Sequence, residues 1–352
     1  MDIILMIVYA TLILSVLVFI HEGGHYLAAR AFGVRVTEFM LGLPGPSIGF
    51  VWRGTRFGLT AVPLGGYAKI CGMEGGDQSP YLKDVLTFTY TKGTVLMEDV
   101  ALELGISNDD AYEALEQLSE WGSIIGPGKK DKFNTYRAPA VKGSYELGQN
   151  RSIEDPAAFF ESEYKQQYRS LPFWKRSVIL LAGIAMNLLF AILLFIVIYS
   201  IIGLDMQNPQ TGEMVHIKLA VWDAVAGGFN AIAMTVSAVV GLFNPATAAT
   251  TVENSTSIVG IAVAAKEYAD LGFSQFLFFS AMISVSLGIM NLLPFPPLDG
   301  GRFVVEVFQK ISRKVVQPRV LSYLSLGGLL LIGVFFVFML NQDIQRFVFG
   351  NW

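Results

Sequence analysis

Two histidines with a glutamate between them are the residues best placed to do chemistry. Residues 21–25 read H-E-G-G-H, an example of the H-E-x-x-H pattern. On a helix, residues four apart lie on one face, so both imidazoles can reach one ion while Glu22 lies beside them. Zinc takes such neutral nitrogens with a third protein ligand and keeps one position for water, whose proton a carboxylate can remove. The spacing predicts a zinc site with His21 and His25 as ligands and Glu22 as general base.

The surroundings of this motif favour a functional site over a chance match. Ionisable residues at the end of a long apolar segment are costly, and those found there usually have a function. Gly23 and Gly24 weaken a helix but leave its backbone bare on one side. A bare backbone suits close helix packing or the approach of a substrate.

The third ligand has to come from another segment. His216 is one candidate. The stretch NLLPFPPLDGGR, residues 291–302, is the better one, because its prolines and glycines must break a helix there. Irregular backbone at membrane depth is tolerated only where it is buried in protein or lines a cavity. Asp299 beside this break is either a zinc ligand or the cap of a helix that starts near Gly300.

The composition indicates that lipid is the solvent for much of the chain. Of the 352 residues, 53% are hydrophobic and 15% are charged, against about 45–50% and about 25% in soluble domains. These values exclude a disordered chain and an ordinary soluble enzyme. A net charge of -4 gives no support to nucleic-acid binding. The single cysteine, Cys71, excludes an internal disulfide and a cysteine-rich metal site.

Four segments are long and apolar enough to cross a membrane. They are Ile3–Ile20 with its continuation to Phe32, Val178–Leu204, Phe273–Leu293 and Val320–Leu340. The first has an acidic residue where a signal peptide has a basic region, so a cleaved leader is not expected. Ile217–Phe243 is apolar but interrupted by polar and glycine residues. It is predicted to be an amphipathic or interfacial helix, with a fifth span as the alternative.

The basic residues predict the orientation of these spans. Seventeen of the 25 Lys and Arg residues fall between Arg30 and Arg176, and five more between Arg302 and Arg319. The positive-inside rule places both loops in the cytoplasm and both chain ends outside. The H-E-x-x-H motif and Asp299 then meet on the cytoplasmic side, whereas His216 falls in an outside loop.

Together these motifs resemble the site-2 protease family, zinc metalloproteases that cut substrate helices within the membrane. HEGGH near the end of the first span and NLLPFPPLDGG at the end of a later one carry the resemblance. It implies that His21, His25 and Asp299 bind Zn²⁺. It also implies Glu22 as the catalytic base and Asn291 as a residue near the bound substrate strand.

Two further segments resemble the family. Val34–Met73 is similar to its membrane-reentrant β-hairpin, and the β-branched and aromatic residues punctuated by Gly and Pro agree with strands. Gly65 and Gly66 in this element are the expected substrate contacts. AGIAMN, residues 182–187, resembles the second-span motif, with Ile184 where a proline is common. Asp205–Lys218 is too short for the PDZ domain that many bacterial relatives carry, so gating by a PDZ domain is not expected.

One soluble segment is not covered by the resemblance. Thr94–Leu104 has a helical pattern, and Ser107 with Asp110 is typical of the start of a second helix that runs to about Trp121. A turn at residues 126–128 then predicts a hairpin between Ser123–Ile125 and Lys132–Arg137. This order of elements suggests a winged helix-turn-helix insert.

The insert is not expected to bind DNA, because its second helix carries five acidic residues and no Lys or Arg. These are Asp109, Asp110, Glu113, Glu116 and Glu120. A helix that faces phosphates should be basic. Three lysines, Lys129, Lys130 and Lys132, are interpreted as part of a solvated turn. Docking of a regulatory protein is the predicted role, and no nucleic-acid partner is expected.

The predicted fold is a polytopic α-helical membrane protein with about four transmembrane helices, a membrane-associated β-hairpin element and a small soluble α/β, winged-helix-like insert. The predicted divisions are 1–33, the first span with HExxH; 34–78, the reentrant β element; 92–139, the insert; 140–172, a linker; 173–204, the second span; 205–272, an external loop and amphipathic helix; 273–301, the third span with the LDG motif; and 302–352, a cytoplasmic loop, the fourth span and the tail.

The predicted function is hydrolysis of a peptide bond in or near the transmembrane helix of a single-span membrane protein. An anti-sigma factor is a typical substrate of the family. The expected location is the bacterial inner membrane, with the lipid bilayer as partner and the site toward the cytoplasm. Two alternatives stay open. A zinc-binding sensor or transporter would need no base at Glu22, and a membrane-tethered transcription regulator would bind DNA through the insert.

Overall fold

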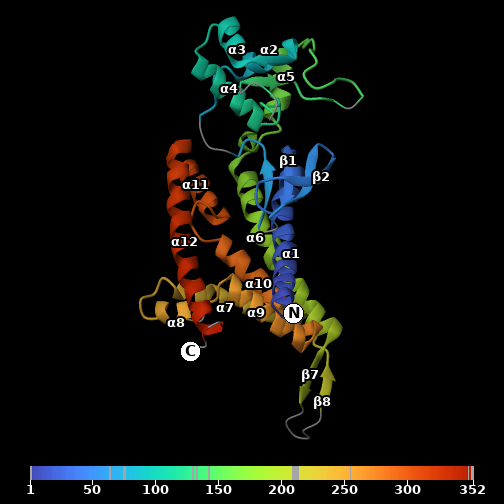
Figure 1. Ribbon diagram of the computed structural model, residues 1–352, viewed down its shortest axis with the longest axis vertical. Helices are drawn as coiled ribbons and strands as arrows, with labels where there is room; N and C mark the ends of the chain where they lie inside the picture. Colours follow the sequence, from blue (N-terminus) through green and yellow to red (C-terminus); the bar gives the residue numbers. More distant parts are fainter. Residues whose placement is uncertain are drawn as a thin grey trace.

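Long apolar helices form the body of the molecule (Figure 1). The computed structural model describes residues 2–62, 65–73, 77–128, 131, 134–141, 143–207, 214–253, 255–347 and 349. Five helices in these ranges are long and apolar enough to cross a membrane. They are α1 (Asp2–Ala31), α6 (Phe173–Ile196, continued by a π-helix to Ile202), α7 (Val221–Gly241), α10 (Phe273–Asn291) and α12 (Pro318–Phe347). The chain is therefore a multi-pass membrane protein.

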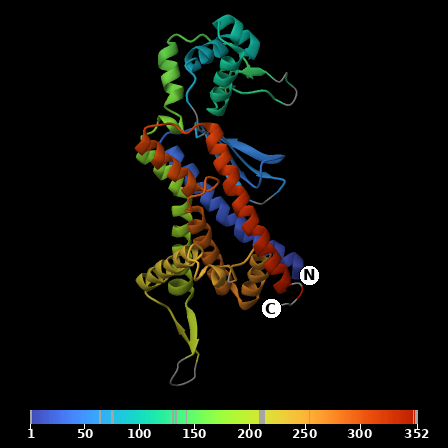
Figure 2. The same ribbon diagram turned by 90° about the vertical axis from the view of Figure 1, so that its left-hand side faces the viewer.

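Whether the chain has four or five membrane spans depends on helix α7. Its length and composition allow a span, which was the alternative prediction. In both views α7 runs crosswise at the lower end of α6, and Ala231 of α7 packs against Leu194 of α6 and Ala281 of α10 (Figures 1 and 2). That orientation is the one the predicted interfacial helix would have.

A four-stranded sheet lies beside α1. Its strands are β1 (Val36–Leu41), β2 (Ser47–Trp52), β3 (Thr55–Thr60) and β4 (Gly66–Ile70), in the order β2-β3-β1-β4. β1 pairs with β3 in parallel and with β4 antiparallel. The predicted hairpin is thus only the β2–β3 part of a larger mixed sheet, because β1 and β4 come from the flanks of the same segment. Pro63 and Leu64 of this segment lie outside the described residues.

The two edges of this sheet have different surroundings. β2 is one edge, and its apolar side chains are exposed on both faces, with Ile48 77% and Val51 72% exposed. A strand in water would alternate apolar and polar residues, so this edge has the character of a lipid-facing surface. β4 is the other edge, and Gly66 in it packs against Val18 of α1.

The insert is a small folded unit above the helical body (Figure 2). Its elements are α2 (Leu82–Lys92), β5 (Thr94–Leu96), α3 (Met97–Leu104), α4 (Asn108–Glu120), β6 (Thr135–Arg137) and α5 (Pro156–Tyr164). β5 pairs antiparallel with β6, and Ile125 forms a bridge with Arg137. Leu86, Leu115, Trp121 and Tyr136 belong to its core.

Two predicted boundaries in and next to the insert differ from the structure. The helix predicted from Thr94 begins at Met97, because the β-branched residues before it pair with β6. The predicted linker 140–172 contains α5, whose N-cap Asp155 accepts hydrogen bonds from the amides of Ala157 and Ala158. The predicted cap at Ser107 is confirmed, since its hydroxyl accepts from the amide of Asp110 at 3.0 Å. Lys129, Lys130 and Lys132 lie outside the described residues.

Arg35, which lies just before β1, connects the membrane-associated sheet to the insert. Its guanidinium donates to both carboxylate oxygens of Glu163, at 2.9 and 3.1 Å, and to the carbonyl of Trp121 at 3.2 Å. The adjacent backbone is also paired, since the amide of Cys71 donates to the carbonyl of Arg35 and that of Tyr168 to the carbonyl of Cys71. This bidentate ion pair positions the insert directly above the sheet.

The thiol of Cys71 is expected to report whether this junction stays closed. The side chain is fully buried, and burial raises its pKa to about 11. Since only the thiolate reacts, maleimide labelling at pH 8 should be at least about 100-fold slower than in the denatured chain. The rate should keep rising with pH up to about pH 11. Labelling at the denatured rate would show that the insert lifts away, and no second cysteine complicates the measurement.

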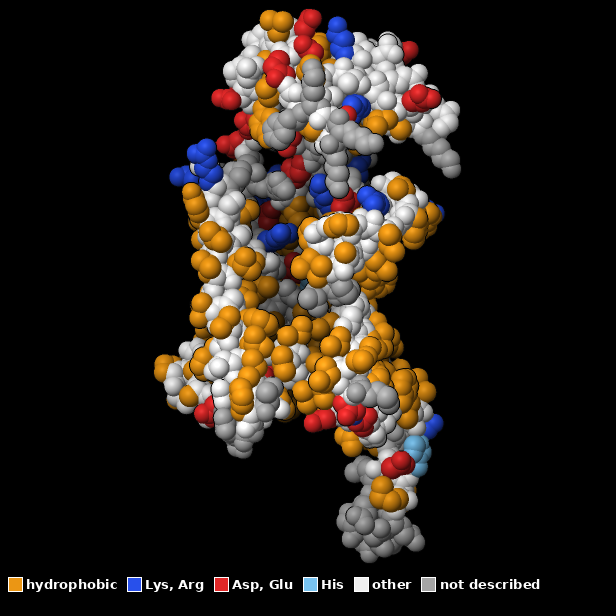
Figure 3. Space-filling model, viewed as in Figure 1, with side chains coloured by type: hydrophobic (Ala, Val, Ile, Leu, Met, Phe, Trp, Pro, Cys, Tyr) orange, Lys and Arg blue, Asp and Glu red, His pale blue; other side chains and the backbone are white. Residues whose placement is uncertain are grey.

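Four further elements lie in the lower part of the molecule, namely β7 (Leu204–Gln207), β8 (Met214–Ile217), α8 (Ala248–Glu253) and α9 (Ile258–Leu271). Helix α11 (Asp299–Ser312) lies higher, beside the upper part of α12 (Figure 1). Buried Asp343 of α12 accepts hydrogen bonds from the amides of Ser257 and Gly260 at the start of α9, which ties the end of α12 to that helix. Hydrophobic side chains cover the middle of the molecule and charged ones gather above it (Figure 3).

Candidate metal centre

Two helices bring three metal-binding side chains together. His21 and His25 lie one turn apart on α1 and are 7% and 6% exposed. Asp299 comes from the first turn of α11. Its Oδ2 lies 3.0 Å from Nε2 of His21 and 3.1 Å from Nε2 of His25, and the two Nε2 atoms are 3.3 Å apart. Among the described residues, this is the group of histidines and carboxylates arranged to hold a metal ion.

The break after α10 delivers Asp299 to the histidines. The N-cap of α11 is Leu298, and it makes no side-chain capping bond. Asp299 lies inside the first turn with its carboxylate against the histidines, so the alternative that it serves only as a helix cap does not hold. A Cβ on Gly300 would lie 2.1 Å from the carbonyl oxygen of Leu292. Glycine therefore lets the first turn of α11 press against the end of α10, which places the carboxylate.

Helix α6 closes the other side of the centre. A Cβ on Gly183 would lie 2.3 Å from Nε2 of His25 and 2.9 Å from Nε2 of His21. A Cβ on Gly24 would lie 2.5 Å from the carbonyl oxygen of Ala182, while Gly23 has open space. Close helix packing therefore explains Gly24, and α6 approaches the imidazoles because residue 183 has no side chain.

The donor set fits zinc. Ligand atoms about 2.0–2.1 Å from a tetrahedral ion are about 3.3 Å from one another, close to the three separations found here. The second nitrogen of His25, Nδ1, lies 2.8 Å from the carbonyl oxygen of Ile179. It must donate to that carbonyl, so Nε2 keeps its lone pair for the metal.

Asn187 of α6 completes the fit on the His21 side. It is fully buried, and its Oδ1 has no hydrogen-bond partner, while its Nδ2 lies 3.2 Å from Nδ1 of His21. Exchanging the amide oxygen and nitrogen lets Oδ1 accept from Nδ1–H of His21. This arrangement satisfies the buried oxygen and leaves Nε2 of His21 free for the ion. Both imidazoles then have the tautomer that metal binding requires.

Removing this acceptor should weaken zinc binding. Asn187→Leu keeps the size of the side chain but leaves Nδ1–H of His21 unpaired, so zinc affinity should fall about 10–100-fold. Asn187→Asp retains an acceptor and should keep most of the affinity. Competition with a zinc chelator measures both variants. Equal affinities for the wild type and Asn187→Leu would show that Asn187 does not orient His21.

Glu22 links the centre to the sheet. It follows His21 on α1, and its Oε2 accepts a hydrogen bond from the amide of Ala68 in β4 at 3.0 Å. A Cβ on Gly66 would lie 3.5 Å from Cγ of Glu22. The carboxylate thus connects the helix that carries His21 and His25 to the edge strand β4.

The other predicted site residues have structural partners of their own. Asn291 donates to the carbonyl of Leu287 in its own helix at 2.9 Å. The carbonyl of Gly65 accepts from the amide of Gly42 at 2.8 Å. Substrate contacts by Asn291, Gly65 and Gly66 stay predictions. His216 pairs with Asp205 in the β7–β8 hairpin and does not belong to the cluster.

Two residues of the centre had no predicted role. Gly183 and Asn187 both belong to the segment AGIAMN, which was assigned only by resemblance. The available signal was a polar amide in an otherwise apolar span, because such a group has to find a partner inside the protein.

An apolar helical body with a His, His and Asp cluster beside a glutamate is the arrangement that a membrane-bound metallopeptidase requires. The comparison with known families agrees. The sequence matches peptidase family M50 over residues 9–335. The chain belongs to this family, the site-2 proteases, which use zinc.

Bacterial relatives match along nearly their whole length. A Campylobacter jejuni protein is 26% identical over 96% of this chain and 92% of its own, and is provisionally named a zinc metalloprotease. Proteins with the same provisional name from Rickettsia conorii and Helicobacter pylori strain J99 are 25% and 28% identical. They cover 95% and 97% of this chain, and 96% and 99% of their own length.

Proposed function

We propose that this metalloprotease is an intramembrane endopeptidase, which cuts a single-span membrane protein in or near its transmembrane helix. The observation that carries the proposal is the position of Glu22. Its carboxylate lies next to two candidate ligands and is hydrogen-bonded to the sheet edge β4. Base, metal site and a strand that can receive a peptide thus meet in one place inside the apolar body.

The proposed roles follow from the chemistry of each side chain. His21, His25 and Asp299 hold Zn²⁺, with Asn187 and the carbonyl of Ile179 orienting the imidazoles. Zinc bound there supplies Lewis-acid activation of water and of the peptide carbonyl. Glu22 takes the proton from the attacking water and passes it to the leaving amine. The close approach of α6 through Gly183 keeps that side of the centre free of solvent.

The substrate is proposed to bind as an added strand. A helix keeps its backbone groups paired internally, so its peptide bonds are not open to attack until it unwinds. The edge of β4 offers backbone groups that an unwound segment can pair with. Asn291, Gly65 and Gly66 are the proposed contacts of that segment. A single-span protein suits this mode, because one helix can leave the lipid and unwind alone.

The orientation is proposed from charge. The loops that flank the metal-binding residues carry most of the basic residues, so the centre is assigned to the cytoplasmic side of the bacterial inner membrane. Cleavage there releases a cytoplasmic fragment, as it would from an anti-sigma factor. The insert is proposed to dock a regulatory protein, because Arg35 holds it next to the strand that receives the substrate.

Cleavage by the purified protein tests the proposal. The full chain in lipid nanodiscs is incubated with a panel of tagged single-span proteins, and the products are sequenced by mass spectrometry. A cut within or beside the apolar segment, lost on chelation and restored by zinc, is the expected result. Cuts confined to soluble loops would overturn the intramembrane assignment.

A further inference from the structure

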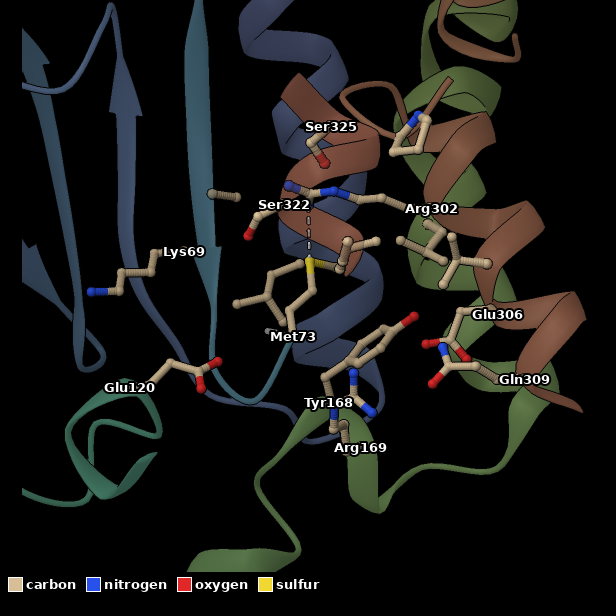
Figure 4. Close-up of a pocket in the computed structure, with 16 residues that line it drawn as sticks. Lys69, Met73, Glu120, Tyr168, Arg169, Arg302, Glu306, Gln309, Ser322 and Ser325 are labelled. Atoms are coloured by element: carbon tan, nitrogen blue, oxygen red, sulfur yellow. Dashed lines mark hydrogen bonds between the residues drawn. The ribbon is translucent and has the colours of Figure 1, made fainter. Parts of the chain in front are cut away.

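A pocket of about 410 Å³ opens between the sheet and the helices, and Glu120 of the insert is part of its lining (Figure 4). One wall is the edge strand β4, through Ala68, Lys69 and Ile70. The opposite wall is formed by α11 and α12, and Met73 and Tyr168 lie between them. The pocket is therefore bounded by the strand proposed to receive the substrate and by the helix that carries Asp299.

Three hydrogen-bond donors converge in this pocket. Arg302 reaches from α11 toward the hydroxyl groups of Ser322 and Ser325 on α12 (Figure 4). Its guanidinium has one hydrogen bond to a described residue, at 3.4 Å to Sδ of Met73. A thioether is a weak acceptor. A guanidinium and two hydroxyls form a donor set that suits a carboxylate.

The acidic residues of the lining do not compete for this donor set. Glu306 is paired with Arg176 of α6 at 3.1 Å. Glu120 has an interaction partner of its own. Lys69 points away from Arg302 (Figure 4). Arg169, the other arginine of the lining, also has an interaction partner of its own and lies near Tyr168 (Figure 4). Arg302 is therefore the charged group next to the two serine hydroxyls.

The position of Arg302 determines which ligand it would meet. It lies three residues after Asp299 on α11, so it is one helical turn from the metal centre. Ala68 lines the pocket and also donates its amide to Glu22. A peptide that pairs with β4 and passes the centre would therefore run directly into the pocket.

We infer that this pocket selects substrates with an acidic side chain close to the cleaved bond, on the side toward the insert. The inference rests on the proposed function. Arg302 binds the carboxylate with two parallel hydrogen bonds, and Ser322 and Ser325 add their hydroxyls. Lysine or arginine at the same position is repelled. The cytoplasmic flanks of single-span proteins are usually basic. A preference for an acidic residue would therefore select a minority of membrane proteins as substrates.

Matched polypeptides test the inference. The polypeptides are versions of one tagged single-span protein. Each version carries Asp, Asn or Lys at one of the first positions that adjoin its apolar segment on the insert side. Its binding to the Glu22→Gln protein is measured in phosphatidylcholine nanodiscs, and its cleavage is measured with Glu22 intact. Arg302→Gln is compared with Lys310→Gln, an equal charge change on an exposed residue of α11 outside the pocket. Zinc content checks that each variant keeps its metal centre.

At one flank position, Asp should bind about tenfold more tightly than Lys. Arg302→Gln should abolish this preference at unchanged zinc content, and Lys310→Gln should keep it. Equal binding of the three polypeptides at every position would overturn the inference even if all are cleaved. An Arg302-dependent preference without cleavage would support the pocket and contradict the proposed protease. Arg302-dependent retention of phosphatidylglycerol without peptide preference would assign the pocket to lipid and overturn the inference.

Discussion

Replacing Glu22 with glutamine is expected to abolish cleavage while zinc stays bound. The amide oxygen of glutamine can still accept the hydrogen bond from Ala68, so the fold around the centre is preserved. Glutamine cannot take a proton from water, and the rate of cleavage should fall by about 10³-fold or more. The measurement is cleavage of a tagged single-span protein, with zinc content determined on the same samples.

A second carboxylate provides the control for this experiment. Glu38 in β1 accepts a hydrogen bond from the hydroxyl of Tyr67 at 2.8 Å and takes no part in the metal cluster. Glu38→Gln should therefore leave cleavage within about twofold of the wild type. If Glu22→Gln keeps its biological output, the protein acts as a zinc sensor or transporter and not as a hydrolase. If Glu22→Gln loses zinc, the residue serves the metal site directly.

A single methyl group added at Gly183 is expected to weaken zinc binding although no ligand residue is replaced. In Gly183→Ala the new Cβ would lie 2.3 Å from Nε2 of His25 and 2.9 Å from Nε2 of His21. The imidazoles would have to turn away, and the three donor atoms would no longer converge. Zinc affinity should fall by about 100-fold or more, and cleavage should be lost with it. Metal analysis and chelator competition give the two values.

Gly23→Ala is the matched variant, because a Cβ there meets nothing within 4 Å on the same helix as the ligands. Alanine at this position should slightly stabilise α1 and leave zinc bound. Gly183→Ala with wild-type zinc affinity would mean that α6 can move away from the histidines. The close packing of Gly24 against Ala182 would then not hold the two helices in register.

The insert shows where local patterns predict well and where they do not. The cap at Ser107, the helix after it and the antiparallel contact between Ile125 and Arg137 follow from residues close together in the sequence. Strand β5 was predicted as the start of a helix. Three residues have no periodicity of their own, and their pairing with Thr135–Arg137 depends on a partner about 40 residues away.

The sequence by itself determined the pair of histidines, the glutamate between them and the apolar segments around them. These are local properties, because a helical repeat places residues 21 and 25 on one face wherever the helix lies. Tertiary structure decided which residues surround that face. Asp299 was expected as a ligand from the helix break beside it and from the resemblance, whereas the roles of Asn187 and of the carbonyl of Ile179 were not predicted. All three reach the histidines from 154 to 278 positions away. Such contacts depend on how α6 and α11 pack against α1, which no spacing within one segment encodes.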